Sequence, residues 1–298
     1  CIILGFFSKR KPIETKELNS IGFIQLWGIG ESITTLSAIK TAKEKFPKAK
    51  ITVFCTQRVK SVFDDQSFVD NIEIISLNPF SILVYLFTYR RTYDLMIDFE
   101  EYLNISSLIA FALGKQRIGY GNQKRSTLYH WRIPYNDKQH VAQTNMDLLQ
   151  GIGIKNPVHV LEPVCVSEES KKAIDHILHS KGIYQHKLIG ISPGAAESSK
   201  SRMWPLTRFA SLAQWILEHY DVHLVLIGNA QEKKLCEELI SLLDEHHRKK
   251  IANLAGKTNI QEAYALILRL DLLVSNDSGP MHIGACLGVK TIGLFGPN

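Results

Sequence analysis

Small and polar residues follow an apolar run near the end of the chain. Residues 272–274 are predicted to form a strand, 275–279 (Ser-Asn-Asp-Ser-Gly) a loop, and a helical pattern then leads to a second apolar run at 291–295. This order is typical of a parallel α/β sheet. Free N–H groups at a helix start favour an anion. The loop therefore predicts a phosphate or nucleotide site at the carboxyl end of a strand.

His282 lies on the first turn of the helix that follows this loop. It can be read as a core-facing histidine or as a donor to a phosphate oxygen. Next to Asp277 and Ser278 we favour the donor.

A second glycine-containing turn, residues 28–32 (Gly-Ile-Gly-Glu-Ser), lies between a predicted strand at 22–27 and a predicted helix at 33–46. It differs from a dinucleotide-binding turn, because Ile33 stands where the third glycine belongs and the strand at 51–55 does not end in an acid. Glu31 remains as a carboxylate at a helix start. It is either an acid stabilised by the helix dipole, which is the more common case, or a general base.

Two further loops follow strands in the second half of the chain. Residues 192–205 combine small residues with Lys200, Arg202 and a Trp-Pro helix start, a composition suited to a phosphate. Residues 228–232 (Gly-Asn-Ala-Gln-Glu) end in Glu232, which either accepts hydrogen bonds from ribose hydroxyls or stabilises the start of the next helix. Both loops extend the anion-binding prediction.

Acidic residues also end the strand predicted at 95–98. Asp98, Glu100 and Glu101 could offer oxygen ligands to a hard divalent cation. Nothing else in the sequence indicates a metal, so we expect a solvated strand end here.

Composition and charge set broad limits. The chain has 298 residues, of which 45% are hydrophobic and 21% charged, as in ordinary globular proteins. Its net charge of +6 is compatible with an anionic substrate, an acidic membrane surface or simple solubility. The five cysteines form no C-x-x-C pair, so neither a disulfide framework nor a zinc site is indicated, and a reducing cytoplasm is expected.

Strand and helix patterns alternate twice, which predicts two α/β domains. We expect an N-terminal extension at 1–19, a first domain at 20–153, a linker at 154–166 with no helical period, and a second domain at 167–298. Residues 1–7 are apolar and precede a basic stretch; they resemble either the end of a truncated membrane or signal segment or a tag-like surface segment. We expect the C-terminal end to be truncated, because it stops just after a strand.

The ordered set of motifs resembles glycosyltransferase family 9, the lipopolysaccharide heptosyltransferases, from about residue 20 to the end. The motifs are, in chain order, GE at 30–31, FP at 46–47, YDLMID at 93–98, RIGY at 117–120, RMWP at 202–205, LIG at 226–228 and NDSGPMH at 276–282. Each motif is weak alone, and the order makes the set specific.

The resemblance implies the GT-B architecture, in which two Rossmann-like domains face a cleft, and an inverting, metal-independent transfer of a sugar. By that resemblance Asp98 is a structural strand end and Glu31 is the catalytic base. Family members usually have Asp at the position of Glu31 and Lys at the position of Arg202. The implied donor contacts also include Glu232, a nucleotide contact. The full set of predicted donor contacts is Gly194, Ser198, Arg202, Glu232, Thr258, Asp277, Ser278, Gly279 and His282.

The implied substrates are a nucleotide-sugar, with heptose from ADP-heptose expected, and a lipopolysaccharide-core-like acceptor. We expect that acceptor to be an anionic glycolipid, contacted by Lys124 and Arg125, with peripheral attachment to the inner face of the cytoplasmic membrane. No metal, other cofactor or nucleic acid is expected. Two alternatives stay open: a nucleotide-sugar epimerase or hydrolase of the same fold, and an inactive nucleotide-sugar-binding member.

Overall fold

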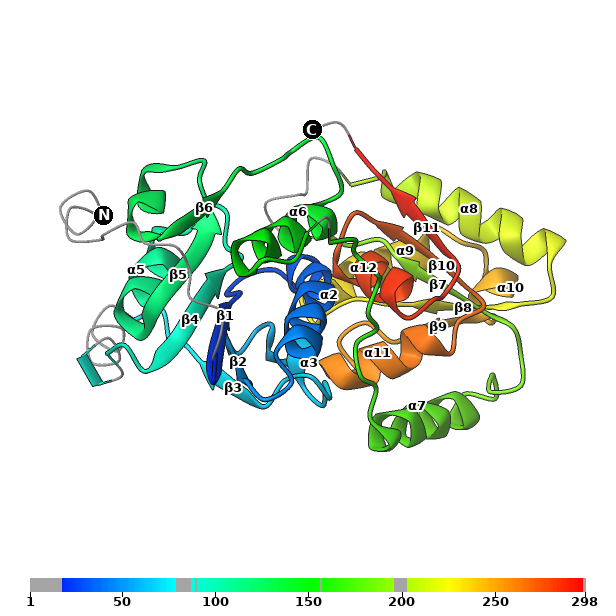
Figure 1. Ribbon diagram of the computed structural model, residues 1–298. Helices are drawn as coiled ribbons and strands as arrows, with labels where there is room; N and C mark the ends of the chain where they lie inside the picture. The colour runs from blue at the N-terminus through cyan, green and yellow to red at the C-terminus, as the bar shows by residue number, and fades with distance from the viewer. Residues whose placement is uncertain (1–17, 79–86, 89, 156, 196–202, 297–298) are drawn as a thin grey trace. The chain divides into compact units, whose positions relative to one another are not determined.

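The computed structural model describes residues 18–78, 87–88, 90–155, 157–195 and 203–296 (Figure 1). The chain divides into two compact units, residues 1–165 (unit 1) and 166–298 (unit 2). This division falls inside the segment predicted as a linker. Most of that segment packs on unit 1, since Glu162 forms an ion pair with Lys40 at 2.9 Å and Gln66 donates to the carbonyl of Pro163 at 3.0 Å.

Unit 1 contains a parallel sheet whose described strands have the order β3-β2-β1-β4-β5-β6. The central strands are apolar and buried, as expected where helices cover both faces. The strands are β1 (Ser20–Ile24), β2 (Lys50–Cys55), β3 (Asn71–Ile74), β4 (Tyr93–Asp98), β5 (Gly114–Tyr120) and β6 (Trp131–Ile133). The helices are α2 (Ile29–Lys45), α3 (Lys60–Phe63), α5 (Asn104–Leu113), η1 (Lys124–Leu128), α6 (Val141–Asp147) and η2 (Leu148–Ile152).

Unit 2 contains a second parallel sheet, of order β11-β10-β7-β8-β9 among its described strands. The strands are β7 (Leu188–Ser192), β8 (His223–Leu226), β9 (Ile251–Asn253), β10 (Leu272–Asn276) and β11 (Thr291–Leu294). The helices are α7 (Glu168–Ser180), α8 (Leu206–His219), α9 (Lys233–Ser241), α10 (Glu245–Arg248), α11 (Ile260–Leu268) and α12 (Gly279–Cys286). Its core lies between β7, β8 and α8.

The alternation predicted from the sequence is confirmed, but three strands were missed. β5 carries Lys115, Gln116 and Arg117, which interrupt an apolar pattern, and β6 and β9 have only three residues each. The helix predicted over 80–89 lies, apart from residues 87–88, outside the described residues. Within the described ranges, no helix is long and apolar enough to cross a bilayer.

Both sheets have a point where the chain reverses its direction of winding. In unit 1, β2 and β3 extend to one side of β1, whereas β5 and β6 extend to the other side of β4. In unit 2 the same reversal occurs between β7 and β10. Ligands of open α/β sheets bind beyond the carboxyl ends of the strands at such points. Each unit therefore has one edge where a site is expected.

Candidate functional site

The predicted base Glu31 lies in the first turn of α2, just after β1. Gly28 has φ of 77°, a conformation that favours glycine, and a Cβ there would lie 1.9 Å from Glu31 Oε2. The carboxylate thus folds back over the α-carbon of Gly28. The Ser32 N–H and hydroxyl both donate to the Gly28 carbonyl, at 3.0 and 2.7 Å, which fixes the turn. The sequence of this turn determines where the Glu31 carboxylate lies.

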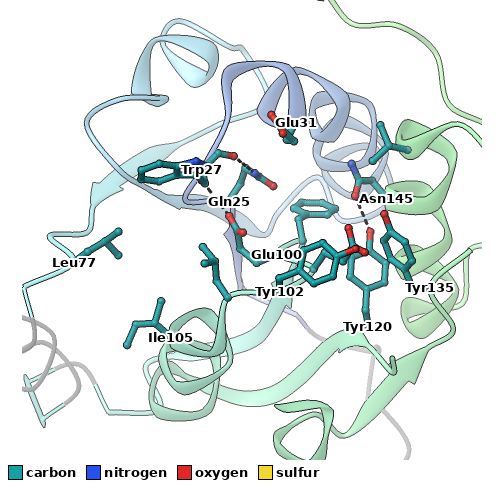
Figure 2. A pocket seen from close by; sticks show the side chains of 14 residues that line it. Gln25, Trp27, Glu31, Leu77, Glu100, Tyr102, Ile105, Tyr120, Tyr135 and Asn145 are labelled. Atoms are coloured by element: carbon teal, nitrogen blue, oxygen red, sulfur yellow. Dashed lines mark hydrogen bonds between the residues drawn. The ribbon is translucent and has the colours of Figure 1, made fainter. Parts of the chain in front are cut away.

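Glu31 lines a pocket of about 410 Å³ in unit 1 (Figure 2). The pocket lies at the winding reversal of the sheet, because Trp27 follows β1 and Phe99 follows β4. Its volume is in the range of small-molecule sites. The structure therefore brings the predicted base to a cavity, although its catalytic role stays a prediction.

Aromatic side chains form much of the pocket. Figure 2 shows Trp27 on one side and Tyr120 and Tyr135 on the other. Trp27 and Tyr102 are 52% and 66% exposed, so their rings are available to a ligand. Tyr120 and Tyr135 meet edge to face, with ring centroids 5.0 Å apart. Such walls suit a ligand that has apolar faces.

Glu100 is a second carboxyl group of this pocket, and its importance was not predicted from the sequence. It lies just after β4, is buried, and accepts hydrogen bonds from the N–H groups of Leu26 and Trp27. Burial raises the pKa of Glu100 to about 7, and the nearby Asp98 adds to the rise, although the two N–H bonds oppose it. A carboxyl group that titrates near neutral pH in a pocket is a candidate functional group.

A buried network supports the segment that carries Glu100. Asp98 is fully buried and accepts hydrogen bonds from Arg125, Tyr129 and Ser106, and its other oxygen accepts from the Glu100 N–H. The Arg125 side chain is also fully buried, with Nη1 3.3 Å from Asp98 Oδ2.

This burial corrects two predictions. Asp98 does not lie at a solvated strand end, because the side chains packed on it replace water. Arg125 is enclosed in the core, so it cannot contact an acceptor as predicted. Lys124 next to it is exposed and is not among the residues that line the pocket.

A chain of hydrogen bonds joins the far wall of the pocket to the turn of Glu31. The Tyr120 hydroxyl donates to Asn145 Oδ1 at 2.7 Å, and Asn145 Nδ2 donates to Thr34 Oγ1 at 2.9 Å. The Thr34 hydroxyl in turn donates to the Glu31 carbonyl at 2.6 Å. These bonds link β5, α6 and α2, so the first turn of α2 is held against the rest of the pocket. No local pattern predicts this contact, since its members are far apart in the chain.

In unit 2, buried Asn276 holds both ends of the loop predicted to bind phosphate. Its side-chain amide donates to the Pro193 carbonyl at 2.7 Å, and its Oδ1 accepts from the Trp204 N–H at 3.0 Å. Ser198 and Arg202, the predicted contacts inside that loop, lie outside the described residues. Asn276 therefore ties the loop after β7 to the carboxyl end of β10.

The predicted residues of the terminal loop are brought together at the start of α12. Ser278 is the residue before the helix, and its hydroxyl lies 3.2 Å from that of Ser275. His282 Nε2 lies 3.8 Å from Asp277 Oδ1, and both side chains are partly exposed. A Cβ added at Gly279 would meet no atom within 4 Å, so the helix start is open at this residue. Helix N–H groups and an imidazole here can meet an anion.

Glu232 lies beside the same edge, before α9. Its Oε2 accepts from the Asn229 N–H at 2.8 Å, and a Cβ on Gly194 would lie 2.0 Å from its Oε1. Burial raises its pKa. Glu232 thus has a local role in the turn and also packs on the predicted contact Gly194. Its contact with ribose, and the predicted role of Thr258 just before α11, stay predictions.

Metal ligands form no cluster in the part of the chain that the structure describes: no group of three or more His, Cys, Asp or Glu side chains could hold an ion there.

Solved structures resemble this fold over nearly the whole chain. A glycosyl transferase of family 9 from Veillonella parvula matches with a TM-score of 0.82 at 19% identity, over 95% of this chain and 82% of that one. The ADP-heptose lps heptosyltransferase II of E. coli matches with a TM-score of 0.77 at 22% identity, over 94% of this chain and 85% of that one. The predicted class, GT-B with two Rossmann-like units, is confirmed.

Comparison of the sequences identifies the family more specifically than comparison of the folds does. Lipooligosaccharide heptosyltransferase 2 of Haemophilus influenzae is 31% identical over 219 residues, which are 70% of this chain and 62% of that protein. The match thus spans less than two thirds of that relative. The profile of glycosyltransferase family 9 (heptosyltransferase) matches residues 88–298, well over half of the sequence. With the ordered motifs and the two sheets, this match shows that the chain belongs to glycosyltransferase family 9.

Proposed function

We propose that this protein transfers a sugar from a nucleotide-sugar to a hydroxyl of a lipopolysaccharide-core-like acceptor. Unit 1 would hold the acceptor and unit 2 the donor. The observation that carries the proposal is the Glu31 carboxylate, which a glycine turn places in the pocket of unit 1. The names of the relatives support heptose as the sugar and an ADP-linked donor.

The reaction follows from the two sites. Glu31 takes the proton of the acceptor hydroxyl, whose oxygen attacks the anomeric carbon of the donor. The bond between that carbon and the diphosphate oxygen breaks, and the configuration inverts. Charge grows on the departing diphosphate, so N–H groups at the start of α12 and His282 would stabilise it. The family resemblance assigns a further cation to Arg202, and neither a metal nor another cofactor is part of this scheme.

The surroundings of Glu31 fit the role of base. A general base must lie within hydrogen-bond reach of the proton that it removes. The hydrogen bonds from Ser32 to the Gly28 carbonyl and from Thr34 to the Glu31 carbonyl hold the backbone of the turn from which the carboxylate projects.

Replacement of Glu31 by Gln tests the proposal. Gln keeps the size of the side chain but cannot take a proton, so we expect turnover to fall roughly a hundredfold or more. Glu44→Gln, near the other end of α2, is the matched control and should keep the wild-type rate. Turnover by Glu31→Gln that equals wild type would remove Glu31 from the mechanism.

The donor and the place of action are tested separately. A thermal-shift screen of ADP-, UDP- and GDP-sugars identifies the nucleotide, since a ligand of the native state raises its melting temperature. An acceptor carried on lipid would place the enzyme at the inner face of the cytoplasmic membrane. Co-sedimentation with vesicles that contain lipopolysaccharide tests this location, and no sedimentation would count against it.

A further inference from the structure

In the part of its wall that the structure describes, the pocket of unit 1 has acidic side chains but no basic ones. Glu31, Glu100 and Glu101 line it, and its described lining residues include no Lys, Arg or His. Arg58 lies over the ring of Trp27, 5.0 Å from its centroid, but is not part of the lining. This composition is the reverse of what an anionic acceptor requires, because like charges repel, more strongly where water is partly excluded.

The two basic residues expected to attract such an acceptor do not alter this picture. Arg125 is fully buried and paired with Asp98, so its charge is already compensated. Lys124 is exposed on η1 outside the lining. The charge of the pocket is therefore set by its carboxylates.

The rest of the wall matches an uncharged sugar. A pyranose ring has apolar C–H faces and a rim of hydroxyl groups. Trp27 and Tyr102 line the pocket with exposed aromatic rings, whereas the amide groups of Gln25 and Asn145 are buried and hydrogen-bonded within the protein. Carboxylates accept hydrogen bonds from hydroxyl groups, so Glu31 and Glu101 can bind the rim.

Glu101 lies beside the aromatic wall. A hydrogen bond with Glu101 raises the pKa of Tyr102, and burial, followed by a hydrogen bond with Glu101, raises the pKa of Tyr135. A phosphate placed between these rings would meet this charge directly.

We propose that the pocket of unit 1 binds an uncharged pyranose ring of the acceptor and discriminates against a sugar that carries a phosphate or a carboxylate there. The inference rests on the proposed role of unit 1 as the acceptor-binding unit. Anionic groups elsewhere on a lipid-linked acceptor would lie outside this pocket.

A matched pair of sugars tests the proposal on the whole chain. Methyl α-mannopyranoside and mannose 6-phosphate are titrated without donor, and binding is followed by saturation-transfer NMR. We expect saturable binding of the neutral sugar and at least about tenfold weaker binding of the phosphate. Equal or tighter binding of the phosphate would overturn the inference, as would absence of saturable binding by the neutral sugar.

Two variants locate the effect. Tyr102→Ala should weaken the neutral sugar about tenfold, because it removes an exposed stacking face. Glu101→Gln should reduce the difference in affinity between the two sugars, because it removes a charge but keeps the side-chain size. Circular dichroism establishes that each variant is folded, and a folded Glu101→Gln protein with an unchanged difference would contradict the proposal.

The binding test and the turnover test can fail separately. Binding of the neutral sugar is measured without donor and needs no catalysis. A protein that prefers the neutral sugar but transfers no sugar would contradict the proposed function and still support the proposed specificity of the pocket. Turnover that depends on Glu31, together with a preference for the phosphorylated sugar, would contradict the proposed specificity but support the proposed function.

Discussion

The winding reversal of the sheet in unit 1 and that in unit 2 occupy the same topological position but differ in chemistry. Between β1 and β4 the chain presents aromatic rings and carboxylates around a pocket. Between β7 and β10 it presents small residues, the open start of α12 and an imidazole. One sheet edge can therefore serve a hydroxyl-rich ligand or a phosphate. The difference comes from the loops, because the strands mainly supply the position.

The largest loss of stability is expected when the buried ion pair that supports the pocket of unit 1 is removed. Arg125→Met leaves the buried Asp98 carboxylate without its cation, and we expect the unfolding free energy to fall by about 3–5 kcal/mol. Urea denaturation followed by circular dichroism measures this. Lys124→Met removes the exposed neighbouring charge and should change the free energy by less than about 0.5 kcal/mol. Equal effects of the two variants would mean that the buried pair contributes nothing special.

A smaller loss of stability is expected when the corresponding hydrogen bonds in unit 2 are removed. Asn276→Ala removes the bonds to Pro193 and Trp204 and leaves their backbone groups unpaired, which should cost about 3 kcal/mol of stability. Because the tethered loop carries predicted donor contacts, ADP affinity should also fall, whereas binding of the neutral sugar should not. Calorimetric titrations measure both affinities. An unchanged ADP affinity in a folded variant would separate the loop from the donor site.

The titration of Glu100 sharpens the comparison, since it makes unit 1 sensitive to pH. Its folded-state pKa of about 7 is above the usual value of 4.5, so the folded protein holds this proton more tightly than the unfolded chain. This carboxyl group therefore lowers stability as pH rises from about 4.5 through 7. Glu100→Gln should match wild type near pH 4.5 and be more stable by about 3 kcal/mol above pH 7. Denaturation curves across this range test the prediction, and a difference that does not vary with pH would contradict it.

The smallest expected effect is on the surface of unit 1. Lys124→Ala should leave the affinity for the neutral sugar within about twofold of wild type, because Lys124 lies outside the pocket lining. The affinity should also be insensitive to salt, because screening acts on interactions between charges. Titrations at low and high ionic strength measure both. A marked loss of affinity in the variant would contradict the position of Lys124 outside the pocket.

The sequence could predict what depends on neighbouring residues. Strand and helix periodicity predicted most of the alternation, and the glycine turn identified Glu31 because Gly28 and Glu31 are only three residues apart. The start of α12 was likewise visible from its loop. These features depend on local backbone geometry, which the residue types control.

The rest depends on contacts between distant residues. Arg125 was predicted to contact an anionic acceptor, yet it is buried against Asp98, which lies 27 positions earlier in the chain. Glu100 appeared to be one acid among three until the N–H groups of Leu26 and Trp27 were seen to converge on it. Residue types and spacing do not reveal such pairs. Yet it is these pairs that determine the charge of the pocket.

Calorimetric titration of ADP into wild type, Glu31→Gln and His282→Ala tests the division of labour between the units most directly. If unit 2 holds the nucleotide diphosphate, His282→Ala loses a hydrogen bond to an anion and should bind ADP about tenfold more weakly. Glu31→Gln should bind ADP within about twofold of wild type. A loss of ADP affinity in Glu31→Gln with none in His282→Ala would contradict the account.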